Sequence, residues 1–421
     1  MKLDWSQISV SLAVSTTAIA EIVTPLLLST SFIPELGGKA LAELPIHLIG
    51  HSRGGSVVSE MARIFGQHGI WVDHVTTLDP HPVSLYNDAS VYLYWNILFA
   101  DNYWQTNPDL FCPNGETIFG AYNRYLSNLI GGYDCSHSDV HLWYHGTIDL
   151  NPFTSDTQAN ITSIDRQNWW TAYESEGTNA GFYYSLIRRG NRLSQVEPAG
   201  SGTGRISDGY NQSWDFGAGV SGNRFVLPSN DGSWPNIIKL NIAGTNTFAI
   251  GQTNSLKVFH QFGRSTADTA NIQLYLDHDF NPLNSNAILI NQVTVFGTGT
   301  NYVLHSLFDF TPNPATTPPG YYSVYAKMTF GGHTRYLYAP EIVLLNPSKQ
   351  SPRLTPIGFQ SGEFQLNVSG FTGQRVIIQS SLNFANWNSL STNTLSGTSL
   401  IFSDIQGTNG GMRFYRAVLT Q

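Results

Sequence analysis

Hydrophobic positions in the first 150 residues change their period several times, which indicates strands alternating with helices. Residues 44–49 form a short apolar run, typical of a strand that is buried on both faces of a parallel sheet. Residues 13–29 predict a helix, and residues 72–78 and 96–100 predict two further strands. Between the first two strands, apolar residues recur at helical spacing, at Val57, Val58, Met61, Ala62 and Phe65. This order predicts a parallel sheet with helical crossovers.

After about residue 200 the pattern changes to short alternating stretches separated by Gly, Asn, Pro and Thr. Such stretches predict antiparallel β-sandwiches. Two sets of apolar residues each share one face of a strand: Ile272, Leu274 and Leu276, and Val324, Ala326 and Met328. The polar segment 346–352 predicts a linker to a final module with strands near 364–368, 376–380, 399–403 and 414–419.

The fold class is therefore multidomain, a partial α/β domain followed by all-β sandwich domains. We expect four parts: residues 1–150, an aromatic-rich connection 151–200, a sandwich 201–347 and a small β-module 353–421. A length of 421 residues fits two to four domains. The stretch 8–33 is interrupted by polar residues and Pro25, so it predicts neither a membrane span nor an evident signal peptide.

Composition excludes several classes of function. Charged residues are only 12% of the chain, but hydrophobic residues reach 41%, so the chain is not of the disordered type. The formal net charge is −8, and basic clusters are absent from the sequence. This balance argues against nucleic acid or an anionic membrane as the main partner. The two cysteines, Cys112 and Cys135, are too few for a disulfide framework; they form either one bridge in an oxidising compartment or two buried thiols.

Residues 50–54 have the pattern G-x-S-x-G, and their context gives the pattern meaning. An apolar strand precedes them and an amphipathic helix follows, as a nucleophile elbow requires. The turn is so tight that we expect Gly50 and Gly54 to be needed for close approach of the backbone. Ser52 would then lie exposed at the N-terminus of the helix, whose dipole favours developing negative charge.

A serine nucleophile needs a base and an acid that orients it. Where such an elbow occurs, the acid and then the histidine follow the serine along the chain. Asp79 is the favoured acid because Pro80 ends its strand at once; Asp101, at the end of the next strand, is the alternative. His137 is the favoured base because it is predicted to lie just before a helix over 140–147, on which the alternative, His141, would lie. No cofactor or metal is implied.

These residues resemble the α/β-hydrolase superfamily, in particular its secreted lipases and esterases. Leu3-Asp4-Trp5 resembles the "VDW" strand end of pancreatic-type lipases, and residues 75–80 resemble their "ITGLDP" segment, in which the Asp is the triad acid. The resemblance covers about a third of the chain. It implies a Ser-His-Asp hydrolase of carboxylic esters, with a small-molecule or lipid ester as substrate and Arg53 N–H as first oxyanion donor. The last module resembles a small β-module of large secreted bacterial proteins, which implies a secreted or cell-surface location.

The chain departs from that family at its start. Only 51 residues precede Ser52, too few for the early strands and the loop that carries the second oxyanion donor. We therefore expect an N-terminally truncated hydrolase, its nucleophile strand open on one side. Loss of one oxyanion donor costs about 2.7–4 kcal/mol in the transition state. The alternative is a non-catalytic secreted or surface binding protein whose β modules carry the function.

Two weaker signals lie outside this candidate site. Residues 277–284 place side-chain oxygens at alternating positions, which suits either a turn between strands or a Ca²⁺ loop, and we prefer the turn. Trp169 and Trp170 suit either a buried core or a platform for sugar rings. Carbohydrate or surface contact through the β-rich part therefore remains an alternative use of these residues.

Overall fold

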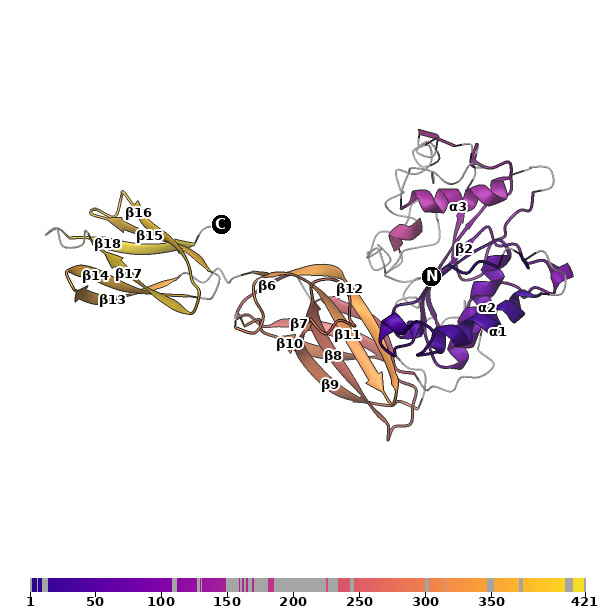
Figure 1. Cartoon of the computed structure of the whole chain (residues 1–421), viewed down its shortest axis with the longest axis horizontal. Coiled ribbons are helices and arrows are strands. Elements are labelled where there is room, and N and C mark those ends of the chain that lie inside the picture. The colour runs from indigo at the N-terminus through magenta and orange to yellow at the C-terminus, as the bar shows by residue number, and fades with distance from the viewer. Residues whose placement is uncertain are drawn as a thin grey trace.

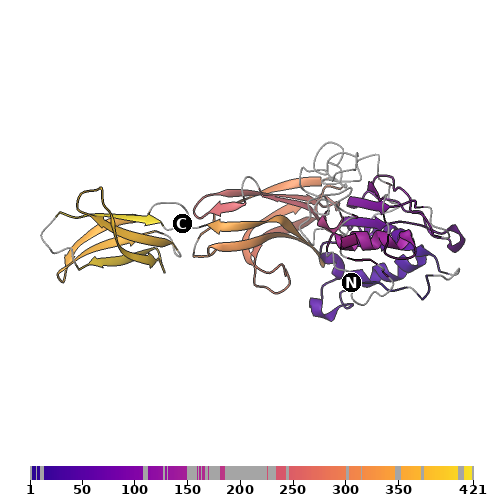
Figure 2. The ribbon, with the colours of Figure 1, turned by 90° about the horizontal axis from the view of Figure 1, so that it is seen from above.

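The computed structural model describes residues 2–5, 7–9, 14–107, 112–126, 129, 131–148, 159, 161–162, 164–165, 169, 181–184, 225, 234–242, 246–299, 303–313, 315–346, 352–370, 374–405 and 412–419. These residues form an α/β part, a β-sandwich and a small C-terminal β-module, which follow one another along the long axis of the molecule (Figures 1 and 2). The multidomain organisation and the change from mixed α/β to all-β structure agree with the sequence pattern.

The α/β part is built on a parallel sheet with the strand order β1-β2-β3-β4. Its strands are His47–His51, Val72–Leu78, Ile97–Trp104 and Tyr122–Tyr125. Every residue of β2 is buried, because β2 is paired on both sides and covered on both faces. The strand β1 is an edge of the described sheet, as expected from the sequence. The fourth strand was not predicted.

Helices cover both faces of this sheet (Figure 1). The helices α1 (Thr16–Leu28) and α2 (Arg53–Gln67) pack together on one face and share a core with the sheet. On the other face, α3 (Ser136–Gly146) packs against aromatic residues of β3 and β4. The predicted start of α3 at residue 140 was wrong, because the helix begins one turn earlier and His137 lies in its first turn. Four short 3₁₀ segments complete the elements: η1 (Pro34–Leu36), η2 (Leu41–Glu43), η3 (Ser84–Tyr86) and η4 (Gly181–Tyr184).

The third strand also differs from the prediction. It was expected to end before Asp101 but continues to Trp104, and Thr76 pairs with Asp101 in the ladder between β2 and β3. Polar residues continue this strand because each finds a partner inside the sheet; Thr77, for example, donates to Asn102 Oδ1 at 2.7 Å. Asp101 is consequently an internal residue of β3 rather than a strand-end residue.

The region between residues 151 and 200 could not be assigned from the sequence. Its described residues Ile161, Trp169 and Phe182 pack into the same cluster as α3. The Gly181 N–H donates to the Tyr103 hydroxyl at 2.6 Å. These described residues therefore belong with the α/β part.

The sandwich consists of two sheets with a shared apolar core, and their strand pairs are antiparallel except for the parallel pair of β6 and β12. One has the order β10-β7-β5 (Val303–Phe310, Asn254–Gln261 and Asn236–Ile242), and the other has the order β6-β12-β11-β8-β9 (Thr247–Ala249, His333–Asn346, Gly320–Phe330, Thr269–Asp277 and Ile288–Phe296). The two predicted apolar sets on β8 and β11 are fully buried, which confirms that each set shares one face.

The C-terminal module is a second, smaller sandwich. Its sheets have the orders β13-β14-β17 (Arg353–Gln360, Glu363–Ser369 and Ser399–Asp404) and β16-β15-β18 (Asn388–Thr394, Arg375–Ser381 and Phe414–Leu419). The four strands predicted here are present, and β13 and β16 are additional. Its core is small and includes Val368, Val376, Ile378 and Leu395.

Buried polar contacts attach the first sandwich to the α/β part. Arg335 of β12 is 1% exposed; it donates to Trp71 O at 3.0 Å and to Asp73 Oδ2 at 3.2 Å. Asn236 of β5 accepts from the Trp71 N–H at 3.0 Å and donates to Gly69 O at 2.8 Å. These partners lie at the beginning of β2, so the sandwich docks at the amino ends of the strands and leaves their carboxyl ends to the candidate site.

Candidate active site

The turn between β1 and α2 has the backbone geometry of a nucleophile elbow. Ser52 has φ 56° and ψ −126°, a region that side chains other than glycine rarely adopt. Its N–H donates to Leu78 O at 2.9 Å, which ties the turn to the end of β2. Ser52 is half-buried and stands directly before the first helical residue, Arg53.

Of the two glycines predicted to be needed for this turn, only Gly50 is required by the close approach of the backbone. A Cβ on Gly50 would collide with the Gly54 carbonyl, so Gly50 has no room for a side chain. A Cβ on Gly54 would meet nothing within 4 Å, so the expectation of steric need there was wrong. The helix instead approaches Pro80 closely at Gly55, where a Cβ would lie 2.9 Å from Pro80 Cβ.

Asp79 and His137 form a short buried pair at the carboxyl end of the sheet. Asp79 Oδ2 and His137 Nδ1 are 2.6 Å apart, and the two residues are 0% and 7% exposed. Asp79 follows β2 directly and has φ 45°, so the backbone turns sharply at the carboxylate. The pair joins two segments that are 58 residues apart in the sequence.

Gln105 is a site residue that the sequence analysis missed. Its N–H and Nε2 donate to Asp79 Oδ1 and Oδ2, both at 2.8 Å. The loop that follows also covers the carboxylate, because a Cβ on Gly115 would collide with Asp79 Oδ1. The only sequence signal for Gln105 was a polar residue directly after a strand, which many surface turns share.

The two imidazole nitrogens of His137 differ in their contacts. Its Nδ1 is engaged with Asp79, whereas Nε2 is buried without a hydrogen-bond partner among the described residues. Over the same described residues, no hydrogen bond joins Nε2 to Ser52 Oγ. Catalytic hydrogen bonds are often long in ligand-free enzymes and tighten only when substrate binds.

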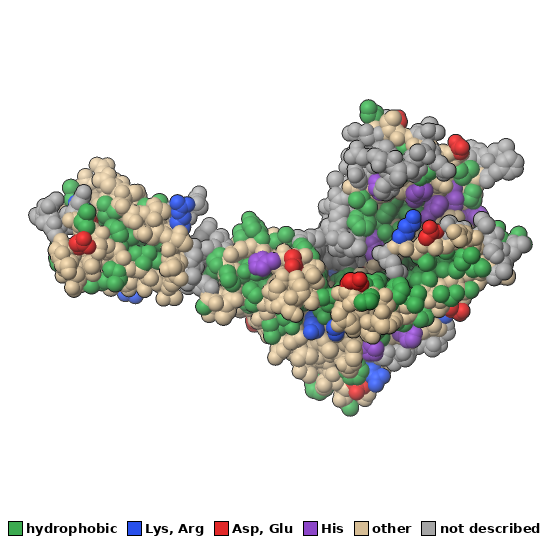
Figure 3. All heavy atoms as spheres, viewed as in Figure 1, with side chains coloured by type: hydrophobic (Ala, Val, Ile, Leu, Met, Phe, Trp, Pro, Cys, Tyr) green, Lys and Arg blue, Asp and Glu red, His purple; other side chains and the backbone are tan. Residues whose placement is uncertain are grey.

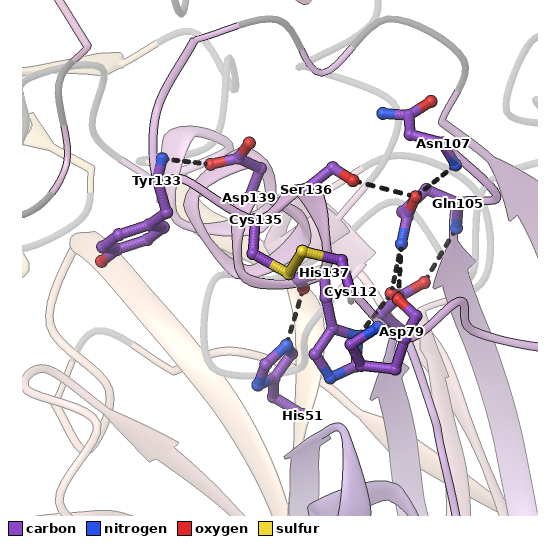
Figure 4. Close-up of a disulfide and its surroundings, with 11 residues drawn as sticks. His51, Asp79, Gln105, Asn107, Cys112, Tyr133, Cys135, Ser136, His137 and Asp139 are labelled. Carbon is purple, nitrogen blue, oxygen red and sulfur yellow. Dashed lines mark hydrogen bonds and ion pairs between the residues drawn. A yellow bond between two sulfur atoms is a disulfide. The ribbon is translucent and has the colours of Figure 1, made fainter. Parts of the chain in front are cut away.

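His51, the residue before the serine, supports the backbone of His137 (Figure 4). Its Nε2–H donates to His137 O at 2.8 Å. Burial, together with the neighbouring His137 and His141, lowers the pKa of His51 to about 3. His51 is therefore neutral at physiological pH. Figure 3 shows histidine side chains gathered on the visible face of the α/β part.

The alternative acid and base make other contacts. Asp101 accepts from His74 Nε2 at 2.9 Å, and both side chains are fully buried. Burial raises the pKa of Asp101 to about 6, against the hydrogen bond from Thr76. His141 Nε2 lies 3.2 Å from the Tyr133 hydroxyl. Of the candidate pairs, the structure brings together Asp79 and His137.

A disulfide joins Cys112 to Cys135 beside this pair (Figure 4). Of the two alternatives left open by the sequence, the structure contains the bridge. Cys135 is the N-cap residue of α3 and precedes His137 by two positions. The bridge therefore fixes the start of the helix that carries the histidine to the loop that covers Asp79.

Arg53 follows the serine and is held firmly by its side chain. The guanidinium forms two 2.6 Å bonds with Asp88 and also donates to Val14 O and Ser9 O. It stacks over the Tyr86 ring at 4.4 Å. These contacts fix the first turn of α2, whose backbone N–H groups point toward the site.

An apolar groove of about 630 Å³ runs along the open edge of β1. Residues of α1, α2, β1 and the N-terminal segment line it, among them Trp5, Leu27, Ile49 and Met61. The elbow residues Gly50, His51 and Gly54 form one end of the lining. Ile49 is 42% exposed, which is high for a residue of the nucleophile strand.

The two weaker sequence signals lie away from this site. In the segment 277–284, Asp279 accepts from Asn284 and Asn286, so its side chain closes a turn between β8 and β9. Trp169 is 6% exposed and packs in the core beside α3, so of the two alternatives for this residue the structure has the buried core. Trp170 lies outside the described residues.

Comparison with known proteins adds little to this picture. No family model matches the chain, and no curated protein is similar enough to count as a match. A CARDB domain from Pyrococcus furiosus, solved in complex with di-metal ions, is 15% identical and matches 28% of this chain and 97% of its own length, with a TM-score of 0.19. The C-terminal domain of Wzt (12% identical, 27% of this chain and 74% of its own) and the human OSCAR ligand-binding domain (13%, 44% and 93%) have TM-scores of 0.20 and 0.18.

The described helices also bear on membrane association. In the part of the chain that the structure describes, none of them is both long and apolar enough to cross a bilayer.

Proposed function

We propose that the chain is a serine hydrolase of the α/β-hydrolase type that acts on carboxylic esters. The observation that carries the proposal is the buried 2.6 Å contact between Asp79 and His137, beside a serine with elbow geometry. Ser52 directly follows β1, Asp79 directly follows β2 and His137 lies in the first turn of α3, an arrangement at the carboxyl side of one sheet that supports the proposal because enzymes of open α/β folds bind their ligands there. The sequence resemblance to lipases and esterases supports the same assignment.

The hydrogen bonds support different roles for the two partners. Asp79 accepts from Gln105 and from His137, which suits an ionised carboxylate that has no proton to donate. His137 must therefore carry its proton on Nδ1, which leaves a lone pair on Nε2. That nitrogen is the general base, and Asp79 keeps the ring in this tautomer and stabilises the imidazolium.

The reaction follows from these roles. Ser52 Oγ attacks the ester carbonyl while His137 Nε2 takes the hydroxyl proton, and a tetrahedral oxyanion forms. The Arg53 N–H, at the N-terminus of α2, donates to that oxyanion. The C–O bond to the alcohol then breaks, and the alcohol leaves with the proton from His137. Water attacks the acyl-enzyme with the same base, which releases the acid and restores Ser52.

The setting of the site favours a lipid or other apolar ester. The groove along β1 is lined mostly by apolar side chains and includes the elbow residues Gly50, His51 and Gly54, so it suits an acyl or alkyl group near the elbow. Neither Ser52 nor His137 is among the residues that line it. The disulfide favours an oxidising compartment, and with the C-terminal resemblance it supports a secreted or cell-surface location.

A second candidate is a binding protein in which the hydrolase half is inert and the β modules carry the function. The observation that favours it is the lack of a hydrogen bond between Ser52 Oγ and His137 Nε2 among the described residues. An open nucleophile strand without a second oxyanion donor would give the same outcome.

A fluorophosphonate probe distinguishes the two candidates. We expect the wild-type chain to be labelled at Ser52 and Ser52→Ala to be unlabelled. Ser59→Ala is the matched control, because Ser59 lies on the same helix but donates to Tyr92 O, away from His137. Labelling that persists in Ser52→Ala would remove Ser52 from the mechanism. Absence of labelling in the folded wild-type chain would favour the binding protein.

A further inference from the structure

We propose that Gln105 is a positioning residue that holds the Asp79 carboxylate aimed at His137. The inference rests on the proposed hydrolase function for its effect on rate, but its structural part can be tested without activity. Gln105 follows β3 by one residue and is 0% exposed. None of its hydrogen bonds among the described residues reaches Ser52, so it acts through Asp79.

Gln105 binds both oxygens of the carboxylate from one residue. Its backbone N–H donates to Asp79 Oδ1 and its side-chain Nε2 to Oδ2, each at 2.8 Å. Oδ2 also receives the bond from His137 Nδ1. Two donors on Oδ2 and one on Oδ1 fix the plane of the carboxylate, so rotation of Asp79 away from the histidine would break all three bonds.

The orientation of the Gln105 amide is determined by its surroundings. Nε2 also donates to Pro113 O at 3.2 Å, whereas Oε1 accepts from the Asn107 N–H at 2.6 Å and from Ser136 Oγ at 3.2 Å. A flipped amide would place its oxygen against the carboxylate and a carbonyl, and its NH₂ group against a backbone N–H. Only one orientation satisfies every group, and in it the donor faces Asp79.

The same amide also connects the acid to the base. Ser136 is the first residue of α3 and precedes His137 directly, and Pro113 follows the disulfide-bonded Cys112. Gln105 therefore joins the end of β2, the loop over Asp79 and the first turn of α3 (Figure 4). The distance between Asp79 and His137 depends on this buried amide as well as on their own bond.

The test compares Gln105→Met with Asn102→Leu. Both changes replace a fully buried amide by an apolar side chain of similar size; Asn102 lies in β3, and Gln105 directly follows that strand. Asn102 bonds to Thr77, Glu116 and Asn123, but neither to Asp79 nor to His137. The readouts are kcat and KM for a soluble ester and the far-downfield NMR signal of the His137 Nδ1 proton.

For Gln105→Met we expect kcat to fall on the order of tenfold to a hundredfold, the loss seen when a partner that orients a metal-ligating side chain is removed, with KM little changed. In Gln105→Met the acid limb of the plot of kcat against pH should move and the Nδ1 signal should weaken. In Asn102→Leu the acid limb and the signal should stay as in the wild type. Equal losses in the two variants, or an unchanged Nδ1 signal in Gln105→Met, would overturn the proposal.

A second variant keeps the proposal testable if Gln105→Met does not fold. Gln105→Glu keeps the shape and the acceptor for Asn107 and Ser136, but it places an oxygen against Asp79. We expect it to weaken the Nδ1 signal as well; a full signal contradicts the inference. The Nδ1 signal is also recorded in Ser52→Ala protein, with and without the change at Gln105. If the signal depends on Gln105 there, the positioning role stands even if the probe never labels the wild-type chain and the proposed hydrolase function fails.

Discussion

Two pairs of an aspartate and a histidine are associated with the parallel sheet, one at its carboxyl edge and one inside it, and they differ in what surrounds them. His137 and Asp79 meet at the carboxyl end of the strands, where His137 is 7% exposed and lies beside the elbow residue His51. His74 and Asp101 meet within β2 and β3, where both side chains are fully buried. The same two residue types thus form a candidate catalytic pair in one place and an internal support in the other.

The difference comes from where each strand ends. Pro80 ends β2 at Asp79, whose positive φ turns the carboxylate toward α3. Asp101 instead continues the ladder and is surrounded by Thr76, Tyr103 and His74, which occupy its oxygens. A histidine–aspartate contact alone does not define a site. What distinguishes the first pair is its position at the carboxyl end of the sheet, beside the elbow.

Replacing each of the two histidines in turn should give the largest difference in kcat between the two pairs. We expect His137→Ala to lower kcat by at least about 10³-fold, because Ser52 loses its base. His74→Ala should instead leave Asp101 without one buried donor and lower the free energy of unfolding by about 1–3 kcal/mol, with a far smaller loss of kcat. Ester hydrolysis and urea unfolding of both variants measure this. Similar losses of kcat would contradict the distinction between the pairs.

The disulfide lies beside the pair of Asp79 and His137, so breaking it should affect that pair more than the pair of Asp101 and His74. The bridge spans 23 residues, and the loop-entropy relation gives about 3 kcal/mol for its effect on the free energy of unfolding. We expect a Cys112→Ala, Cys135→Ala double variant to lose stability by about that amount and to be labelled more slowly at Ser52.

The double variant provides its own control. A thiol reductant should slow labelling of the wild type and leave the double variant unchanged. If the reductant slows both to the same extent, the bridge is not what positions His137.

Asp101 of the second pair should contribute to the pH dependence of the free energy of unfolding. Burial raises the pKa of Asp101 to about 6, whereas an unfolded Asp titrates near 3.9. Between about pH 4 and 6 the folded chain therefore binds more protons at this residue, so its contribution to the free energy of unfolding falls as pH rises. Asp101→Asn should remove this slope, at most about 1.4 kcal/mol per pH unit. Denaturant unfolding across this range tests it, and identical slopes for wild type and variant would refute the assignment.

The sequence predicted the parts of the fold that depend on local pattern. The strand at 72–78, the elbow around Ser52 and the apolar faces of the sandwich follow from periodicity and glycine placement. The end of β3 could not be predicted, because polar residues such as Asn102 continue a strand only when partners on neighbouring strands are present.

The candidate site was predictable to the level of residue types and order along the chain. Asp79 and His137 were preferred from strand and helix ends, although His137 lies within the first turn of α3 rather than before it. Gln105 could not be found from sequence, because its role depends on bonds to three segments that only the folded chain brings together.

The comparison of Asp79→Asn with Asp101→Asn tests the central claim most directly. The measurement is the rate at which a fluorophosphonate labels Ser52 in each folded variant. An amide at position 79 cannot stabilise the imidazolium, so we expect labelling to slow by up to about 10⁴-fold, whereas Asp101→Asn stays near the wild-type rate. If Asp101→Asn abolishes labelling and Asp79→Asn retains it, the assignment of the acid is wrong and the two pairs have exchanged roles.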